Sequence, residues 1–116
     1  MILSACLWFA MNCYYYQPVA KYETKEEIKQ YIESSFDNAG LDSDKALAVA
    51  NCESHFDPKA THTNTNGSTD GGVWQINSIH KLSDDCRYDV RCSTQWVIEK
   101  VKNEGNWSAW TCAKRL

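Results

Sequence analysis

The stretch ESHFDPKATHTNTNGSTDGGVWQINS, residues 53–78, decides the fold because the character of the sequence changes within it. Apolar residues recur at helical spacing before it, whereas Thr, Asn, Gly and Ser dominate after Pro58. The pair Asn66-Gly67 is typical of a tight turn between two strands. The sequence therefore predicts an α+β fold that is mainly helical and contains a small antiparallel β-hairpin or sheet.

A first helix is marked at both ends. Thr24-x-x-Glu27 is a capping box, and Gly40 is a typical helix stop. Apolar residues recur between them at helical spacing, at Ile28, Tyr31, Ile32 and Phe36. This pattern predicts a structural helix that buries one face.

A second helix is predicted to begin with Asp42 or Ser43 as its cap and to run toward Pro58. One face of this helix is shared by Ala46, Val49, Ala50 and Glu53. Glu53 therefore extends an apolar face instead of pointing into water. Lost hydration and the carbonyl end of a helix both raise the pKa of a carboxyl group, as a general acid requires. The alternative is an edge glutamate that pairs with Lys59.

Asp70 lies 17 residues after Glu53, on the return strand of the predicted hairpin. Its neighbours Ser68, Thr69 and Asn64 offer hydrogen bonds and water can reach it, which suits a charged carboxylate. A glycosidase needs such a pair, with one carboxyl protonated to expel the leaving oxygen and one charged to face the developing oxocarbenium ion. The alternative is ordinary turn chemistry, because Asp before Gly-Gly is common in loops.

The composition fits one globular domain, with 116 residues of which 43% are hydrophobic. The formal net charge is −3 and the Lys and Arg residues are scattered, so no basic patch indicates nucleic-acid binding. This charge gives no electrostatic attraction to an anionic polymer such as a bacterial wall, and binding to one would depend on a shaped cleft. We expect a monomer with no cofactor and no metal site.

The first residues, MILSACLWFAMNCYYY, form an apolar run that is too short to span a bilayer and lacks the basic flank of an ordinary signal peptide. Leu3-Ser4-Ala5-Cys6 resembles the cleavage box of bacterial lipoproteins. We expect residues 1–21 to be the remnant of an export signal, a lipoprotein-type segment or a membrane anchor, and the protein to be exported to the periplasm, the cell envelope or the medium. The alternative is a buried N-terminal segment.

Four cysteines lie beyond this segment, at Cys52, Cys86, Cys92 and Cys112. An even number allows three pairings in an oxidising compartment, and the absence of Cys-x-x-Cys disfavours a zinc ribbon. We favour a local bond between Cys86 and Cys92 and a long one between Cys52 and Cys112, which would tie the helix of Glu53 to the C-terminal segment. The alternative is four reduced thiols in a cytosolic protein.

The opening stretch resembles the active-site region of C-type lysozymes, including the spacing of the two carboxylates. The resemblance is carried by Glu53-Ser54-His55-Phe56, Asn64-Thr65, Gly67-Ser68-Thr69-Asp70 and Gly72-x-x-Gln75-Ile76-Asn77-Ser78. The segment from Gly40-Leu41-Asp42 to Pro58-x-Ala60 is also similar to soluble lytic transglycosylases of bacteria and phages. Gly71 stands where lysozymes usually have an aromatic residue, and Trp74 where they have a smaller apolar one. The resemblance implies a lysozyme-like catalytic domain at residues 22–116, in which the hairpin or small sheet forms one wall of a cleft.

The resemblance implies cleavage of the β-1,4 bond between N-acetylmuramic acid and N-acetylglucosamine in peptidoglycan glycan strands. Glu53 would be the general acid, and Asp70 the stabilising carboxylate or the nucleophile. A lysozyme would complete the reaction with water, whereas a lytic transglycosylase would form a 1,6-anhydro product. The match at Asp70 favours hydrolysis, and the short segment between Ser78 and Asp89 favours the transglycosylase.

Four further residues are implied to bind substrate. Asn64 would form a hydrogen bond near Asp70, and Gln75 and Asn77 would line the cleft floor and contact the sugar N-acetyl group. Trp107, in an element that resembles the Trp-x-Ala-Trp of the family, would pack against the acid and keep it dry. The alternative for Trp107 is a plain core tryptophan.

Two other classes of function stay open. A catalytically silent lysozyme-like protein could bind the wall or calcium, and Asp84, Asp85 and Asp89 loosely resemble the calcium loop of α-lactalbumin. A structural role, as a wall-binding module in a secretion or conjugation machine, is the second alternative.

Overall fold

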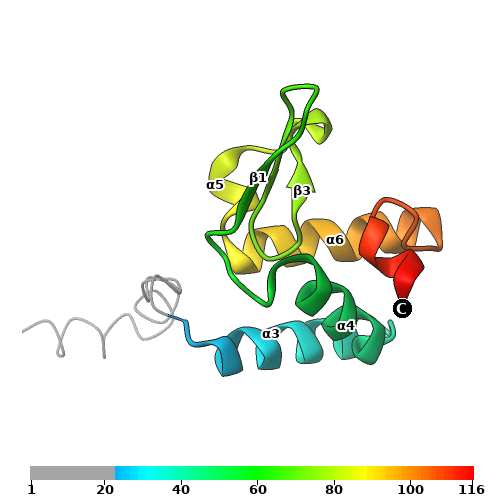
Figure 1. Ribbon diagram of the computed structural model, residues 1–116. Coiled ribbons are helices and arrows are strands. Elements are labelled where there is room, and N and C mark those ends of the chain that lie inside the picture. Colours follow the sequence, from blue (N-terminus) through cyan, green and yellow to red (C-terminus); the bar gives the residue numbers. More distant parts are fainter. Residues whose placement is uncertain (1–22) are drawn as a thin grey trace, which may run out of the picture.

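The computed structural model describes residues 23–116 (Figure 1). The export or anchor segment predicted for residues 1–21 lies outside the described residues. The described elements follow one another as α3 (Lys25–Asn38), α4 (Ser43–Ser54), β1 (Thr61–Thr63), β2 (Thr69–Gly71), β3 (Ile76–Asn77), η1 (Ser78–His80), α5 (Asp84–Arg87), α6 (Val90–Glu104) and η2 (Thr111–Arg115). The α+β prediction, mainly helical with a small antiparallel sheet, is confirmed.

Helix α3 begins at the predicted capping box. The side chain of Thr24 accepts a hydrogen bond from the Glu27 amide at 3.2 Å, and the Glu27 carboxylate accepts one from the Thr24 amide at 2.8 Å. The helix ends at Asn38, and Gly40 follows with φ of 73°. Its buried residues are Ile28, Ile32 and Phe36, so the helix covers the core with the predicted face.

Helix α4 begins as predicted, because the Asp42 side chain accepts a hydrogen bond from the Lys45 amide at 3.1 Å. The helix ends at Ser54, four residues before Pro58, so Glu53 lies at its carbonyl end as predicted. His55 and Phe56 take left-handed conformations with φ of 55° and 63°, which end the helix and bury the Phe56 ring.

The sheet has three antiparallel strands in the order β1-β2-β3. The Asn64 amide donates to the Ser68 carbonyl and the Gly67 amide donates to the Asn64 carbonyl, so the hairpin loop is one residue longer than a two-residue Asn66-Gly67 turn. Strand β3 is only two residues long and pairs Asn77 with Asp70.

The core lies between the helices and the sheet. Figure 1 shows the strands on one side of the molecule and α3 on the other, with α4 and α6 between them. One disulfide, Cys52–Cys112, ties α4 to η2, and another, Cys86–Cys92, ties α5 to α6, as the sequence favoured. Within residues 23–116, none of the helices combines the length and the apolar character needed to cross a membrane.

Candidate active site

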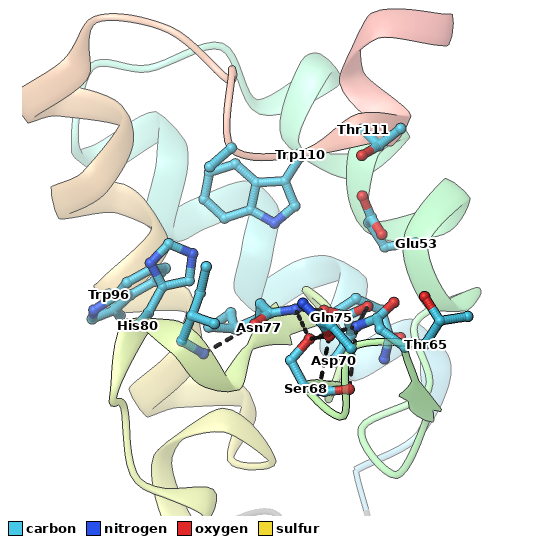
Figure 2. A pocket seen from close by; sticks show the side chains of 15 residues that line it. Glu53, Thr65, Ser68, Asp70, Gln75, Asn77, His80, Trp96, Trp110 and Thr111 are labelled. Atoms are coloured by element: carbon cyan, nitrogen blue, oxygen red, sulfur yellow. Dashed lines mark hydrogen bonds between the residues drawn. The ribbon is translucent and has the colours of Figure 1, made fainter.

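A pocket of about 470 Å³ lies between the end of α4, the sheet and the start of η2. Figure 2 shows Glu53 on the same side of this pocket as Trp110 and Thr111, and Asp70 within a polar cluster on the other side. His80 and Trp96 line the pocket farther along. The fold therefore brings the two carboxyl groups singled out in the sequence to opposite walls of one cavity.

Glu53 occupies the last turn of α4, and it extends the face on which Ala46, Val49 and Ala50 are buried. Burial raises the pKa of Glu53, the backbone amide of Cys112 lowers it, and the charge of Asp70 raises it again. The net shift is upward, which is the direction that a general acid needs. No ion pair in the described part of the chain involves Glu53, so the pairing with Lys59 is not formed.

Asp70 is held by two side-chain amides. Nδ2 of Asn64 donates to one carboxylate oxygen at 3.1 Å, and Nδ2 of Asn77 donates to the other at 2.7 Å. Figure 2 shows these bonds within the cluster around Ser68. Because each oxygen has its own donor, the orientation of the carboxylate plane is fixed. Asp70 lines the pocket in this orientation. The predicted hydrogen bond between Asn64 and Asp70 is present.

Asn77 lines the pocket as predicted and also binds Asp70. Its amide nitrogen donates to Asp70 and to Oγ of Ser68, and its oxygen accepts from the Ile79 amide at 3.0 Å. Both polar ends of this side chain are used inside the protein, because the short strand β3 directs the residue across the sheet toward Asp70. Asn77 therefore orients Asp70, and its contact with a sugar N-acetyl group stays a prediction.

Gln75 lines the pocket as predicted, but its amide nitrogen is turned toward the protein. It donates to the carbonyls of Ala60 and Gly72 at 3.0 and 2.9 Å, and the backbone is left-handed with φ of 48°. The side chain thus ties the start of β1 to the turn after β2. This bracing role depends on a tight turn that the sequence did not reveal.

Trp107 does not line the pocket. Its ring packs against Phe36, Trp74 and Trp110 with centroid distances of 5.7, 6.0 and 5.3 Å, which is the alternative of a core tryptophan. Trp110, three residues later, lines the pocket on the side of Glu53, and its Nε1 donates to the Trp74 carbonyl at 2.8 Å. Trp107 thus has the place of the predicted alternative, and Trp110 supplies an aromatic side of the pocket.

Tyr88 explains why residue 71 is a glycine instead of the usual aromatic residue. A Cβ atom at Gly71 would lie 2.7 Å from the Tyr88 ring, so the tyrosine packs where a side chain of residue 71 would stand. The Tyr88 hydroxyl also shares a hydrogen bond with Oγ1 of Thr61 at 2.8 Å. The other departure, Trp74, is fully buried and donates from Nε1 to Oγ1 of Thr94. Both changes are thus accommodated by packing around β2.

The acidic segment near α5 has structural partners. Asp84 pairs with Arg87 at 2.8 Å, and Asp89 caps α6 by accepting from the Cys92 amide at 2.7 Å. Among the described residues, no three His, Cys, Asp or Glu side chains are grouped so that they could hold a metal ion. Capping and ion pairing account for two of the three carboxylates that suggested calcium.

Comparison with known proteins adds one finding. A family model described as "Lysozyme like domain" matches residues 34–112, and no curated protein matches the chain. The matched residues include α4, the sheet, α6 and both carboxyl groups of the pocket.

Proposed function

Because the chain belongs to the lysozyme-like domain family, we propose that it cleaves the β-1,4 bond between N-acetylmuramic acid and N-acetylglucosamine in peptidoglycan. One observation carries this proposal: Glu53 and Asp70 line one pocket in opposite environments. Burial favours the protonated form of Glu53, and two amides hold Asp70. Lysozyme is the type case of such a division between two carboxyl groups.

In the first step, Glu53 gives its proton to the glycosidic oxygen as the bond from that oxygen to the anomeric carbon breaks. The bonding electron pair stays on the leaving oxygen, and positive charge develops on the sugar. Asp70, fixed by Asn64 and Asn77, faces this charge across the pocket and lowers its energy. Glu53 is left as a carboxylate and can act as a base in the second step.

The second step has two forms. In hydrolysis, water attacks the anomeric carbon while Glu53 takes one of its protons, which gives a reducing end. In transglycosylation, the 6-hydroxyl of the muramoyl residue attacks its own anomeric carbon and Glu53 takes the hydroxyl proton, which gives a 1,6-anhydro ring. Both forms need the same first step and the same acid.

The two walls of the pocket suit a glycan. Asn64, Thr65 and Ser68 present polar groups from the hairpin, whereas Trp96 and Trp110 present apolar rings from the helical side. Sugars offer hydroxyl edges and apolar faces, so a pocket with one polar and one aromatic wall can contact both. The two disulfides support an oxidising, exported location for the domain at residues 22–116.

The test is incubation of the purified protein with peptidoglycan, followed by mass spectrometry of the soluble fragments. Release of muropeptides is expected. Fragments with reducing ends would identify a lysozyme, and fragments lighter by one water would identify a lytic transglycosylase. Absence of soluble fragments would contradict the proposal and favour a silent wall-binding module.

A further inference from the structure

Arg87 is a buried arginine that does not line the pocket. It ends the short helix α5, and its side chain is only 4% exposed. Its guanidinium contacts the backbone of β2 and β3. Nη1 donates to the backbone carbonyls of Thr69 and Ile76 at 3.0 and 2.9 Å. Nη2 donates to Oγ1 of Thr69 at 3.2 Å and to Oδ1 of Asp84 at 2.8 Å.

The two carbonyls that Nη1 binds have a special place in the sheet. Thr69 directly precedes Asp70 on β2, and Ile76 directly precedes Asn77 on β3. Asp70 and Asn77 are cross-strand partners, and the Asn77 amide donates to the Asp70 carboxylate at 2.7 Å. A single nitrogen atom of Arg87 thus joins the two strands through the residue that precedes Asp70 on β2 and the residue that precedes Asn77 on β3.

Strand β3 needs this support because it is only two residues long. So short a strand forms few ladder hydrogen bonds, and its position relative to β2 is weakly fixed by the backbone alone. The guanidinium, with donors in a rigid plane, can bind two carbonyls at once, which a lysine ammonium does less well.

Helix α5, which carries Arg87, is held firmly against its neighbours. A Cβ atom at Gly72 would lie 2.0 Å from the Arg87 carbonyl oxygen, so only glycine allows α5 to approach β2 this closely. Cys86, the preceding residue, is bonded to Cys92 on α6. Burial of a cation is unfavourable unless its donors are satisfied. Four hydrogen bonds from Nη1 and Nη2 hold this guanidinium in place, whereas its buried Nε has no partner among the described residues.

We propose that Arg87 is a positioning residue for the reaction: it fixes the Asp70 carboxylate by holding β2 and β3 together through their backbone carbonyls. This inference rests on the proposed function. Arg87 touches no substrate, and it acts through the geometry of the hydrogen bond between Asp70 and Asn77.

The first test compares kcat and KM on soluble peptidoglycan glycan chains for the parent, Arg87→Met, Asp70→Asn and the double variant. Arg87→Met should lower kcat about 30-fold with little change in KM, the scale expected when a reacting group is displaced by less than about 1 Å. In the Asp70→Asn background, Arg87→Met should cause no further loss, because the group that it positions is already gone. Arg91→Met is the matched control, since Arg91 is an exposed arginine on α6 whose ion pair with Glu23 lies away from the sheet.

Two milder variants cover the case in which Arg87→Met does not fold. Arg87→Lys keeps the charge and should restore part of kcat. Asp84→Ala removes an exposed partner and leaves three of the four guanidinium hydrogen bonds, so kcat should fall about threefold. In all Arg87 and Asp84 variants the NMR signals of the Asn77 side-chain amide should shift, and in Arg91→Met they should not.

The outcomes separate the two proposals. A parent protein without activity on glycan chains contradicts the proposed function, and the Asn77 signals still report on Arg87. Equal losses of kcat from Arg87→Met in the parent and in Asp70→Asn, or full activity of Asp70→Asn, would overturn the positioning role. Unmoved Asn77 signals in every folded Arg87 variant would also overturn it.

Discussion

The burial of Glu53 has opposite effects on the stability of the fold and on the proposed chemistry. Burial at the end of α4 disfavours its charged form, so the folded protein holds this proton more tightly than the unfolded chain does. The same shift keeps a proton available for transfer to a glycosidic oxygen. A residue that favours the proposed reaction in this way should destabilise the fold at neutral pH.

This conflict predicts how Glu53→Gln changes the free energy of unfolding with pH. The pKa of Glu53 is raised above its ordinary value of 4.5, so both the folded and the unfolded states are protonated well below that value. As pH rises, the unfolded chain ionises first and the parent loses stability until the folded pKa is passed. Glu53→Gln should therefore be more stable than the parent at pH 7 and equal to it near about pH 3.5.

Thermal unfolding at both pH values measures this difference, with Glu33→Gln as the matched control because Glu33 is an exposed glutamate of α3. Glu33→Gln should unfold at the same temperature as the parent at pH 7. If Glu53→Gln is less stable than the parent at pH 7, the inward position of Glu53 does not raise its pKa.

At the scale of elements, the contact between β2 and α5 shapes the site. Gly71 ends β2 and Gly72 follows it. A Cβ atom at Gly71 would meet the Tyr88 ring, and one at Gly72 would meet the backbone carbonyl of Arg87, which excludes a side chain there. The close approach allows Arg87 to reach the carbonyls of Thr69 and Ile76. The Gly-Gly pair therefore has a packing function in addition to its role in a turn.

Substitution of two glycines by alanine separates packing from backbone strain. Gly67 and Gly72 both have positive φ, at 87° and 81°, but a Cβ atom meets nothing at Gly67 and meets the Arg87 carbonyl at Gly72. Gly67→Ala should cost about 1 kcal/mol of unfolding free energy from strain alone. Gly72→Ala should cost about 3 kcal/mol, because backbone must also move. Equal costs in urea unfolding would show that α5 is not pressed against β2.

Local signals predicted the beginnings of the helices and the hairpin. The caps at Thr24 and Asp42 and the turn at Gly67 each depend on residues within four positions of one another, so the sequence contains them. Pro58 predicted the end of α4 only approximately, because His55 and Phe56 leave the helical conformation to bury the Phe56 ring in the tertiary structure. Strand β3 is too short to show a periodicity.

The candidate site was predictable to a similar extent. The inward face of α4 predicted the environment of Glu53, and the resemblance to lysozymes implied the bond between Asn64 and Asp70. The choice between Trp107 and Trp110 depends on how the chain turns after α6, which residue types do not encode. Arg87 was missed because an arginine among aspartates has the pattern of an exposed, solvated segment, whereas the structure buries it.

At the scale of the whole molecule, the two disulfides within residues 23–116 differ in the length of chain that they close. Cys52–Cys112 spans 60 residues and joins the end of α4, next to Glu53, to η2. Cys86–Cys92 spans 6 residues and holds α5 against α6. The long bond encloses the sheet, α5 and α6, so it restricts the unfolded chain far more than the short bond does.

The difference in loop length predicts unequal losses of stability. Replacing Cys52 and Cys112 by alanine should lower the unfolding free energy by about 4 kcal/mol, and the same change at Cys86 and Cys92 by about 2 kcal/mol. Urea unfolding of the two double variants measures both values. A larger loss from the short bond would mean that native contacts of α5 matter more than the entropy of the unfolded chain.

The pocket is also a property of the whole molecule, because α4, the sheet and η2 each supply one of its walls. The central claim is that these elements place Glu53 as the acid of a peptidoglycan-cleaving site. The most direct measurement is the rate at which purified parent, Glu53→Gln and Glu33→Gln proteins release soluble fragments from peptidoglycan. Glu53→Gln should lose about 10³-fold in rate, whereas Glu33→Gln should keep the rate of the parent. Release by Glu53→Gln at the parental rate would contradict the account.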